Sequence, residues 1–543
     1  MNQRRSGNEL SRRGLLNRAG TLLAGAAALP TATAALSAWN TPAAAAYSAS
    51  VGTSPAARTA RKPRAAYDYT LRETFDEFDR LFHSGDGIGQ PTDNNEDGAL
   101  AWGQSYVLHG FLRMYEAYQD TAYLDRLVEN ADLVLANRDS ERGVTDHRGR
   151  SEPAWRAMGD YTAATVDLLD ASGQPCLQIR CARSPAGGSS VEVIAESDGL
   201  FSIEFTHGSG STASFEHLTM DPNSADYAVD RIYQAYEDGN KVTAIALDSN
   251  EPPAAGTSEL NSEAVVFSVH TGMISYPLAA FARLVTEDPQ LQDRYGKKAT
   301  SYLEAVSDAL HVHDHEWVTD GDLGYYTWLK GTPLWYDGNP CPLNYTTAMG
   351  RAWLELARAT GNPDDADYAA RIARLVLDQF STDDGDATIW HYWLTFAPIW
   401  SGYEATGNPE TDVSLYTPSY APGSGAKTME DASHGAITVD FAGLAHEHGV
   451  VLTDADMTAL ARTYTQNLAT TDEDGTPTIF LRVDGSGDLA PSGQYLQAPR
   501  WIRTAGFDET VFTHCRDIYA ARQPEPNVGS VLSNTSALNW YRR

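Results

Sequence analysis

Two acids, a hydroxyl and an imidazole stand together in the stretch MEDASHGAITVDFAGLAHEHG, directly ahead of an apolar helical pattern. They are Glu430, Asp431, Ser433 and His434. A helix start needs one capping side chain, and Asp431 or Ser433 meets that need by accepting hydrogen bonds from free backbone amides. The positive end of the helix dipole favours a neutral imidazole, which is competent as a general base. The stretch therefore predicts a cap combined with a base, His434, that Glu430 or Asp431 orients.

A second group of chemically capable side chains occurs in TIWHYWLTFAPIW, where Trp390, His391 and Tyr392 are consecutive. Aromatic faces stack on the apolar faces of sugar rings, and a His–Tyr pair can supply a base and an acid. An aromatic cluster between packed helices is the alternative. Consecutive large side chains cannot all face one way, so we expect part of this group to line an open surface.

Polar and aromatic residues also open three other apolar helical stretches. They are Asn344 with Tyr345 in PLNYTTAMGRA, His270 with Tyr276 in HTGMISYP, and Trp102 in WGQSY. Their shared position at helix starts predicts that they converge on one funnel, together with His434.

The stretch SEPAWRAMGDYT adds Trp155 and Arg156, a stacking residue beside a guanidinium that can clamp a carboxylate. Asp146 and Glu152 lie just ahead of it and, with Glu430 and Asp431, are candidates for the paired carboxylates of a glycoside hydrolase.

Metal signals are weaker. The run DNNEDG supplies Asp93, Asn95 and Asp97, which resembles the opening of a calcium loop, but its twelfth position is Gln104 instead of a bidentate Glu. We expect no metal or other cofactor, with calcium as the alternative.

Helical periodicity recurs in pairs from residue 101 onward, in roughly five helical hairpins separated by Gly/Asp/Pro turns. Such hairpins in series predict a mainly α protein, an α/α toroid with an inner and an outer ring of helices, with an open solenoid as the alternative. The expected parts are an export signal at 1–46, a linker at 47–66, toroid at 67–164 and 256–543, and an inserted unit at 165–255.

The inserted unit has a period of two in segments such as SVEVIAES and LFSIEFTH, and also in YAVDRIYQAY, as we read it. This pattern predicts an antiparallel β-domain that either binds glycan or buttresses the ring, and we expect it to buttress the ring. The four cysteines, Cys176, Cys181, Cys341 and Cys515, are too few for a disulfide scaffold, and we expect buried, free thiols.

The chain carries a formal charge of −32, from 72 acidic and 40 basic residues among 543. Such a field repels phosphate, so neither nucleic acid nor an anionic membrane is an expected partner, and the composition is typical of proteins from high-salt environments. Arg12 and Arg13 precede a short Ala-rich apolar run, which predicts twin-arginine export, cleavage near Ala46 and an extracytoplasmic mature protein. Oligomeric state cannot be read from these features.

With WGQSY, HTGMISYP, PLNYTTAMGRA, WHYW and EDASHG at its hairpin junctions, the chain resembles the α/α-toroid carbohydrate-active enzymes over about 100–160 and 260–522. That superfamily holds polysaccharide lyases, uronyl epimerases and glucuronyl hydrolases. Its lyases work with an Asn/His/Tyr set, and the resemblance implies Asn344, His434 and Tyr392 or Tyr345 for that set here.

The leading hypothesis is a secreted lyase that cleaves uronate-containing polysaccharide by β-elimination. Asn344 and Arg156 would neutralise the uronate, His434 would take the C5 proton, and Tyr392 or Tyr345 would protonate the leaving oxygen. A glycoside hydrolase and a uronyl epimerase are the alternatives on the same fold. A non-catalytic glycan-binding surface protein is the alternative from another class.

Overall fold

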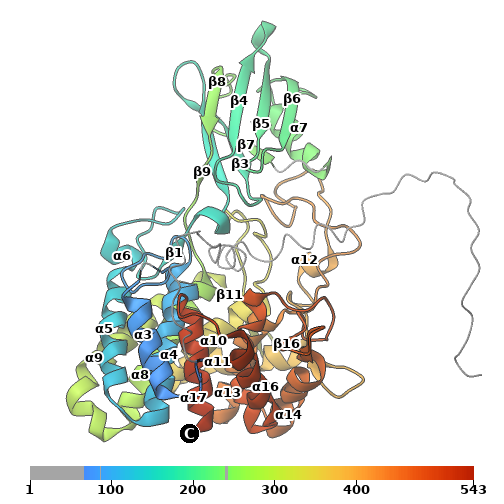
Figure 1. Cartoon of the computed structure of the whole chain (residues 1–543). Coiled ribbons are helices and arrows are strands. Elements are labelled where there is room, and N and C mark those ends of the chain that lie inside the picture. Colours follow the sequence, from blue (N-terminus) through green and yellow to red (C-terminus); the bar gives the residue numbers. More distant parts are fainter. Residues whose placement is uncertain (1–65, 86, 239–241) are drawn as a thin grey trace, which may run out of the picture. The chain divides into compact units, whose positions relative to one another are not determined.

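The computed structural model describes residues 66–85, 87–238 and 242–543 (Figure 1). The expected export signal at 1–46 and all but the last residue of the expected linker lie outside these residues. Among the described residues, no helix has the length and apolar character needed to cross a membrane.

Six helical elements form a closed inner ring in which each packs against the next and the last packs against the first. In ring order they are α4 (Ser105–Tyr118), α8 (Ser268–Glu287), α10 (Leu343–Thr360), α13 (Ala432–Glu447), the 3₁₀ element η8 (Ala498–Gly506) and α17 (Gly529–Arg542). Two glycines allow the closest approaches. A Cβ at Gly272 of α8 would lie 2.5 Å from the backbone of Ala348 in α10, and one at Gly529 would lie 2.3 Å from the carbonyl oxygen of Gly103.

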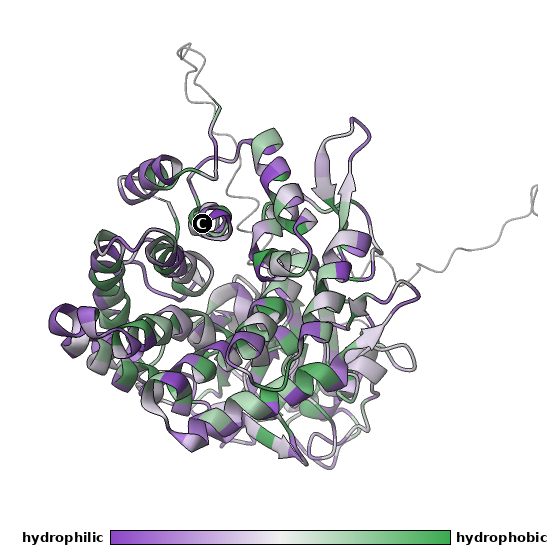
Figure 2. Cartoon of the chain, turned by 90° about the horizontal axis from the view of Figure 1, so that it is seen from below, coloured by the Kyte–Doolittle hydropathy of each residue, from purple (hydrophilic) through white to green (hydrophobic). Residues whose placement is uncertain are grey.

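An outer helix covers each inner element. The outer helices are α3 (Arg72–His83), α5 (Ala122–Ala136), α9 (Pro289–His311), α11 (Pro363–Gln379), α14 (Asp454–Arg462) and α16 (Thr510–Arg522). Their buried residues recur at three- and four-residue spacing, as in Leu124, Leu127, Ala131 and Val134 of α5. Figure 2 shows the helices from below, several of them end-on, with hydrophobic and hydrophilic positions alternating along each helix.

The mainly helical prediction is confirmed, and the hairpins close into a ring instead of an open solenoid. The expected count of about five hairpins was one short. The sixth inner–outer pair is α17 with α3, from opposite ends of the described chain, joined by the bond from Asn539 Nδ2 to the carbonyl oxygen of Tyr69 at 3.0 Å. No turn connects these two helices, so a search for consecutive helix pairs cannot find them.

Two four-stranded antiparallel sheets lie between α5 and α8 in the sequence, in the orders β7-β3-β2-β9 and β6-β5-β4-β8. The strands are β2 (Ala164–Leu169), β3 (Pro175–Cys181), β4 (Ser190–Ala195), β5 (Phe201–Thr206), β6 (Thr212–Leu218), β7 (Val242–Ala246), β8 (Gly256–Glu259) and β9 (Asn261–Ser262). We call this part the β-unit. In β5 the alternation is clear, because Phe201, Ile203 and Phe205 are buried and Glu204 is exposed.

One strand prediction was wrong. YAVDRIYQAY forms helix α7 (Ala228–Gln234) and a 3₁₀ turn, η5 (Ala235–Asp238). Its buried residues, Ala228, Val229, Ile232 and Tyr233, have the three- and four-residue spacing of a helix, which we had read as alternation. The four cysteines are buried, and none of them forms a disulfide bond.

Candidate functional site

The start of α13 is a capped helix end. Asp431 is the N-cap, and its Oδ1 accepts hydrogen bonds from the backbone amides of Ser433 at 3.0 Å and His434 at 3.1 Å. Gln494, a residue that the sequence reasoning missed, accepts a second bond from the Ser433 amide at 3.1 Å. Asp431 therefore has the structural role that its position predicts.

The same aspartate also orients His434. Its Oδ2 lies 2.5 Å from Nδ1 of His434, while Nε2 has no hydrogen-bond partner among the described residues. The His434 side chain is 12% exposed. A carboxylate that binds Nδ1–H fixes the tautomer in which Nε2 carries the lone pair, so this arrangement presents a base toward solvent.

Glu430 has the opposite environment. It is fully buried, and neither carboxylate oxygen has a hydrogen-bond partner in standard geometry. Burial, and then the charge of Asp431, raise the pKa of Glu430 well above its usual range. Burial acts in the same direction on Asp431, but the electrostatic attraction of the His434 ring and the hydrogen bonds from His434 and Ser433 outweigh it and hold the pKa of Asp431 well below its usual range. Two consecutive carboxyls thus hold opposite protonation states.

Backbone pairing brings the second aromatic group to this helix start. The Tyr392 amide donates to the carbonyl oxygen of Thr428 at 3.0 Å, and the Glu430 amide donates to that of Trp390, also at 3.0 Å. The rings of Tyr392 and His434 meet edge to face, with centroids 5.7 Å apart. Tyr392 is half-buried, and burial, followed by the neighbouring Tyr336, Glu430 and Asp431, raises its pKa well above the usual range, so its hydroxyl keeps its proton.

The start of α10 joins the same group. The Leu343 amide donates to the carbonyl oxygen of Tyr392 at 3.3 Å. Asn344 is fully buried, and both its Oδ1 and its Nδ2 lack partners among the described residues. Burial, and then the charges of Tyr336 and Tyr392, raise the pKa of Tyr345. Residues 343–345, 390–392 and 430–434 therefore lie together, as the helix starts predict.

Unpartnered polar groups gather where inner elements begin. Besides Asn344 and Glu430, they include both amide atoms of Gln104, at the end of the π-helical turn η2 (Leu100–Gln104), and Oγ of Ser268, the first residue of α8. Buried polar groups in native proteins almost always have partners. Other unpartnered polar atoms are spread over the described chain, and those at the inner helix starts are the ones that a polar ligand at this end of the ring could bind.

Several predicted sugar-binding residues do not have the exposure that stacking needs. Trp155 is 1% exposed, and its indole donates to the carbonyl oxygen of Val134 at 2.9 Å. Trp390 is fully buried between Phe380 and Trp501. A ring with no accessible face cannot stack on a sugar, so the stacking role proposed for these two tryptophans is wrong for this conformation.

Tyr276, His270 and Arg156 also have partners inside the protein. Tyr276 is buried under the guanidinium of Arg351. His270 contacts Asn95 through Nδ1 at 3.2 Å, and burial lowers its pKa to about 3.

Arg156 binds Glu96 through both Nε and Nη2, at 3.2 and 2.6 Å, so its guanidinium is not a free clamp for a substrate carboxylate. Trp102 and His391 are half-buried, with Trp102 edge-on to His270 and His391 edge-on to Trp400.

One group in the described part of the chain has the spacing of a metal site. Ligand atoms of Glu430, Asp431 and His434 lie within 4.8 Å of one another. However, Asp431 and His434 already satisfy each other, and we assign no ion to them. The calcium alternative has little support, since Asp93 accepts the amides of Gly89 and Gln90, and Asn95 accepts the amide of Ala101.

The carboxylates offered for hydrolysis outside α13 are engaged as well. Asp146 accepts a hydrogen bond from Nε of Arg148 at 2.9 Å, and Glu152 pairs with Arg150 at 2.9 Å.

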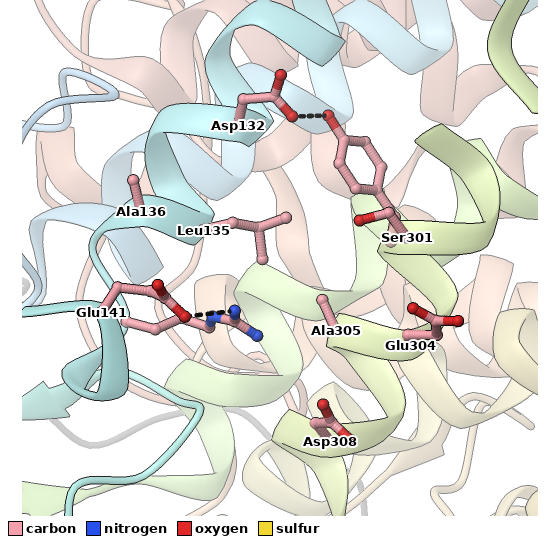
Figure 3. Close-up of a pocket in the computed structure, with 10 residues that line it drawn as sticks. Asp132, Leu135, Ala136, Glu141, Ser301, Glu304, Ala305 and Asp308 are labelled. Atoms are coloured by element: carbon pink, nitrogen blue, oxygen red, sulfur yellow. Dashed lines mark hydrogen bonds and ion pairs between the residues drawn. The ribbon is translucent and has the colours of Figure 1, made fainter. Parts of the chain in front are cut away.

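A hollow of about 400 Å³ lies elsewhere, on the outer ring between α5 and α9 (Figure 3). Asp132, Glu141, Glu304 and Asp308 line it, and Tyr302 donates to Asp132 across it at 2.8 Å. No residue predicted from the sequence to act in a site lies there.

Comparisons with known proteins find no matching family model and no matching curated protein. Solved structures with some likeness include a family 76 α-mannanase from Bacteroides thetaiotaomicron (12% identity, TM-score 0.30), covering 48% of this chain and 61% of that chain. An inactive variant of the α-1,6-mannanase of Salegentibacter sp. HEL1_6, in complex with α-1,6-mannotetrose, has 13% identity and a TM-score of 0.32, covering 51% of this chain and 76% of that one. A family 76 glycoside hydrolase from a bovine Bacteroides thetaiotaomicron strain has 10% identity and a TM-score of 0.27 over 67% and 95%. All three are named as glycoside hydrolases, and likeness of this extent does not assign an activity to the present chain.

Proposed function

We propose that the chain is a carbohydrate-active enzyme whose acid–base groups are Asp431, His434 and Tyr392, with Glu430 beneath them. The observation that carries the proposal is the pairing of a partly exposed Asp–His dyad with a proton-holding tyrosine, at a ring end where buried polar groups lack partners. The polysaccharide substrate follows from the resemblance of the helix-start motifs to toroid enzymes.

Hydrolysis of a glycosidic bond is the first candidate reaction. It needs one carboxyl that holds a proton and one that is ionised, and environments that push two pKa values apart identify such a pair. Glu430 and Asp431 fit this description. Because Glu430 is fully buried, hydrolysis further requires that substrate binding opens a path to it.

β-Elimination at a uronate is the second candidate, and the observation in its favour is exposure. His434 and Tyr392 both reach the surface, so the imidazole can take the C5 proton and the phenol can protonate the leaving oxygen. Asn344 would neutralise the uronate carboxylate through its unpartnered amide and, because it is fully buried, elimination too requires that substrate binding opens a path to it. A uronyl epimerase would use the same proton abstraction and return the proton to the opposite face.

The test is a panel of uronate polymers, neutral glycans and α-1,6-mannan, incubated at high salt with the wild-type chain and with Glu430→Gln and Tyr392→Phe. New reducing ends without unsaturated product, lost in Glu430→Gln, support hydrolysis. Ultraviolet-absorbing unsaturated ends, lost in Tyr392→Phe and kept in Glu430→Gln, support elimination. Solvent deuterium in an uncleaved polymer supports epimerisation. Binding without any product favours the non-catalytic glycan-binding alternative and overturns the proposal.

We also propose export by the twin-arginine route, on the strength of Arg12 and Arg13. Replacing both with Lys should leave the chain in the cytoplasmic fraction. A variant that is still exported would contradict this.

A further inference from the structure

The segment that leads into α13 lies between two other segments of the chain. Residues 428–431 pair with residues 390–392 on one side and with residues 481–483 on the other. Side chains along extended segments alternate between two faces, and residues that stand opposite each other share a face. The three segments therefore present two faces with different side chains.

The inner face belongs to the packed interior. Trp390, Glu430 and Val483 are fully buried. A Cβ added at Gly435 would lie 3.1 Å from the side chain of Trp390, 3.3 Å from that of Val483 and 3.4 Å from that of Glu430. These three side chains thus meet beneath the first turn of α13.

The outer face carries polar side chains. Asp431 stands opposite Arg482, and Met429 stands opposite His391, and all four residues are half-buried. His434 joins this face through its bond to Asp431. The outer face therefore includes the proposed base and an arginine that the sequence reasoning passed over.

Arg482 forms no ion pair with a described carboxylate. Its Nη1 donates to the carbonyl oxygen of Met429 at 2.7 Å, and no hydrogen bond joins Nε or Nη2 to a described residue. In contrast, Arg156, the carboxylate clamp expected from the sequence, is held by Glu96 through two bonds. A guanidinium that the backbone holds by one nitrogen keeps its other donors for a carboxylate or a sulfate group.

A second cation lies farther along the same segment. Lys427 is exposed, two positions before Met429, and its Nζ lies 4.7 Å from the centre of the Trp400 ring. Trp400 contacts His391 of the outer face edge to face, with centroids 5.6 Å apart. The indole thus holds the ammonium group beside the outer face, where Lys427 forms no ion pair with a described carboxylate.

The charge of the whole chain gives these two cations their significance. At a formal charge of −32 the protein repels an anionic polymer. Salt at about 0.15 M screens charges beyond about 8 Å, so cations in direct contact with the polymer decide whether it binds. Two cations without carboxylate partners near the proposed base therefore favour a charged sugar over a neutral one.

We propose that Arg482 and Lys427 form an anion-binding subsite beside the Asp431–His434 dyad, which takes the carboxylate of a uronate or a sulfate ester on the sugar. The inference rests on the proposed function and gives it a substrate class, an acidic polysaccharide. Arg482 would bind the anion next to the dyad through Nε and Nη2. Lys427 would meet a further charge as the polymer follows the segment.

The test is calorimetric binding of four polymers to the full chain: polygalacturonate, its carboxyl-reduced form, dextran sulfate and dextran. At about 0.15 M salt, at least one charged polymer should bind more tightly than its neutral counterpart. Arg482→Gln should weaken that binding about tenfold or more, and Lys427→Met about threefold, because the exposed lysine contributes less. Tighter binding of polygalacturonate identifies a carboxylate site, and tighter binding of dextran sulfate identifies a sulfate site.

Arg374→Gln and Lys297→Met are the matched controls. They remove exposed cations from the outer helices α11 and α9, and they should leave each affinity within about twofold of wild type. Arg482→Lys keeps the charge and should recover part of the lost affinity, whereas a loss caused by displacement of Met429 would persist in it.

Equal binding of charged and neutral polymers, no binding of any polymer, or unchanged affinity in both Arg482→Gln and Lys427→Met would overturn the inference. Turnover of neutral glycans alone would also overturn it while supporting the proposed function. Binding that depends on Arg482, without any product from the substrate panel, would support the subsite and overturn the proposed function.

Discussion

Two buried carboxyls with opposite surroundings lie in helix α13 and in the segment that leads into it. Near its middle, Asp440 accepts hydrogen bonds from Arg503 Nε at 2.8 Å, Arg351 Nη1 at 2.9 Å and Arg113 Nη2 at 3.4 Å. Just before its start, neither carboxylate oxygen of Glu430 has a hydrogen-bond partner in standard geometry among the described residues, and the nearby Asp431 amide, Arg482 and Trp390 do not offset the effect of burial on its pKa. Both side chains are removed from water, but only Asp440 has arginine partners that offset the cost of burying a carboxylate.

The difference indicates that Asp440 stabilises the fold, whereas Glu430 is a candidate for proton transfer. Burial raises the pKa of Asp440, but the charges of Arg503, His109 and Arg351 outweigh it and hold that pKa far below its usual range. A charge surrounded in this way is fixed in one state. At Glu430 the missing partners leave a carboxyl that can exchange a proton beside the Asp431–His434 dyad. In and beside α13, the carboxyl with ionic partners belongs to the structural framework, and the carboxyl without them lies at the candidate site.

The largest effect is expected for His434→Ala. General acid–base catalysis contributes about 100- to 10,000-fold, so kcat should fall by that factor. Because the ring is partly exposed and only Asp431 bonds to it, the thermal midpoint should change little and glycan affinity should persist. Steady-state kinetics, calorimetric binding and thermal melts would check this. Full turnover in the variant would remove His434 from the mechanism and, with it, the contrast between the start of the helix and its middle.

The variant Asp440→Ala tests whether Asp440 and its arginine partners stabilise the fold. Removing one partner of a buried ionic network costs about 3–5 kcal/mol, because the arginines remain buried without their carboxylate. Denaturant unfolding should show that loss, while turnover per folded molecule stays near wild type.

Asp440→Asn is the matched control, since it keeps an acceptor of similar shape and should lose less. The depressed pKa of Asp440 gives stability that is present above its unfolded pKa and is lost as pH falls, so the difference between wild type and Asp440→Asn should shrink in acid. A loss below about 1 kcal/mol for Asp440→Ala would show that the network is not the scaffold element proposed here.

Local sequence patterns predicted the paired helices, strands β4 and β5 and the position of the α13 start, because these depend on periodicity and on capping residues within a few positions. They also predicted that Asn344, Tyr392 and His434 meet, since all three precede or open inner helices. The α17–α3 pair was not predictable in this way, because its residues are far apart in sequence.

The burial of individual side chains and the identity of their partners could not be predicted from the local sequence either. Arg156 looks like a free cation until Glu96 is seen beside it, and Trp390 looks like a sugar platform until Trp501 covers it. Both partners lie more than fifty residues away. Nothing near Gln494 in the sequence indicates its bond to the start of α13.

The smallest effect, and the most direct test of the protonated carboxyl, is expected for Glu430→Gln. Glutamine is close in shape to a protonated glutamate, so at low pH the two proteins should have similar free energies of unfolding. The raised pKa of Glu430 means that the folded state holds a proton that the unfolded state releases, and wild-type stability is therefore lost as pH rises from the unfolded pKa toward the folded one. Each pH unit in that window corresponds to about 1.4 kcal/mol, and the variant should lack this decline, so it should become the more stable protein as pH rises.

Urea unfolding at a series of pH values, with Glu404→Gln as an exposed control, measures the difference. If Glu430→Gln and wild type keep the same pH dependence, Glu430 is ionised in the folded protein, and the contrast with Asp440 does not hold.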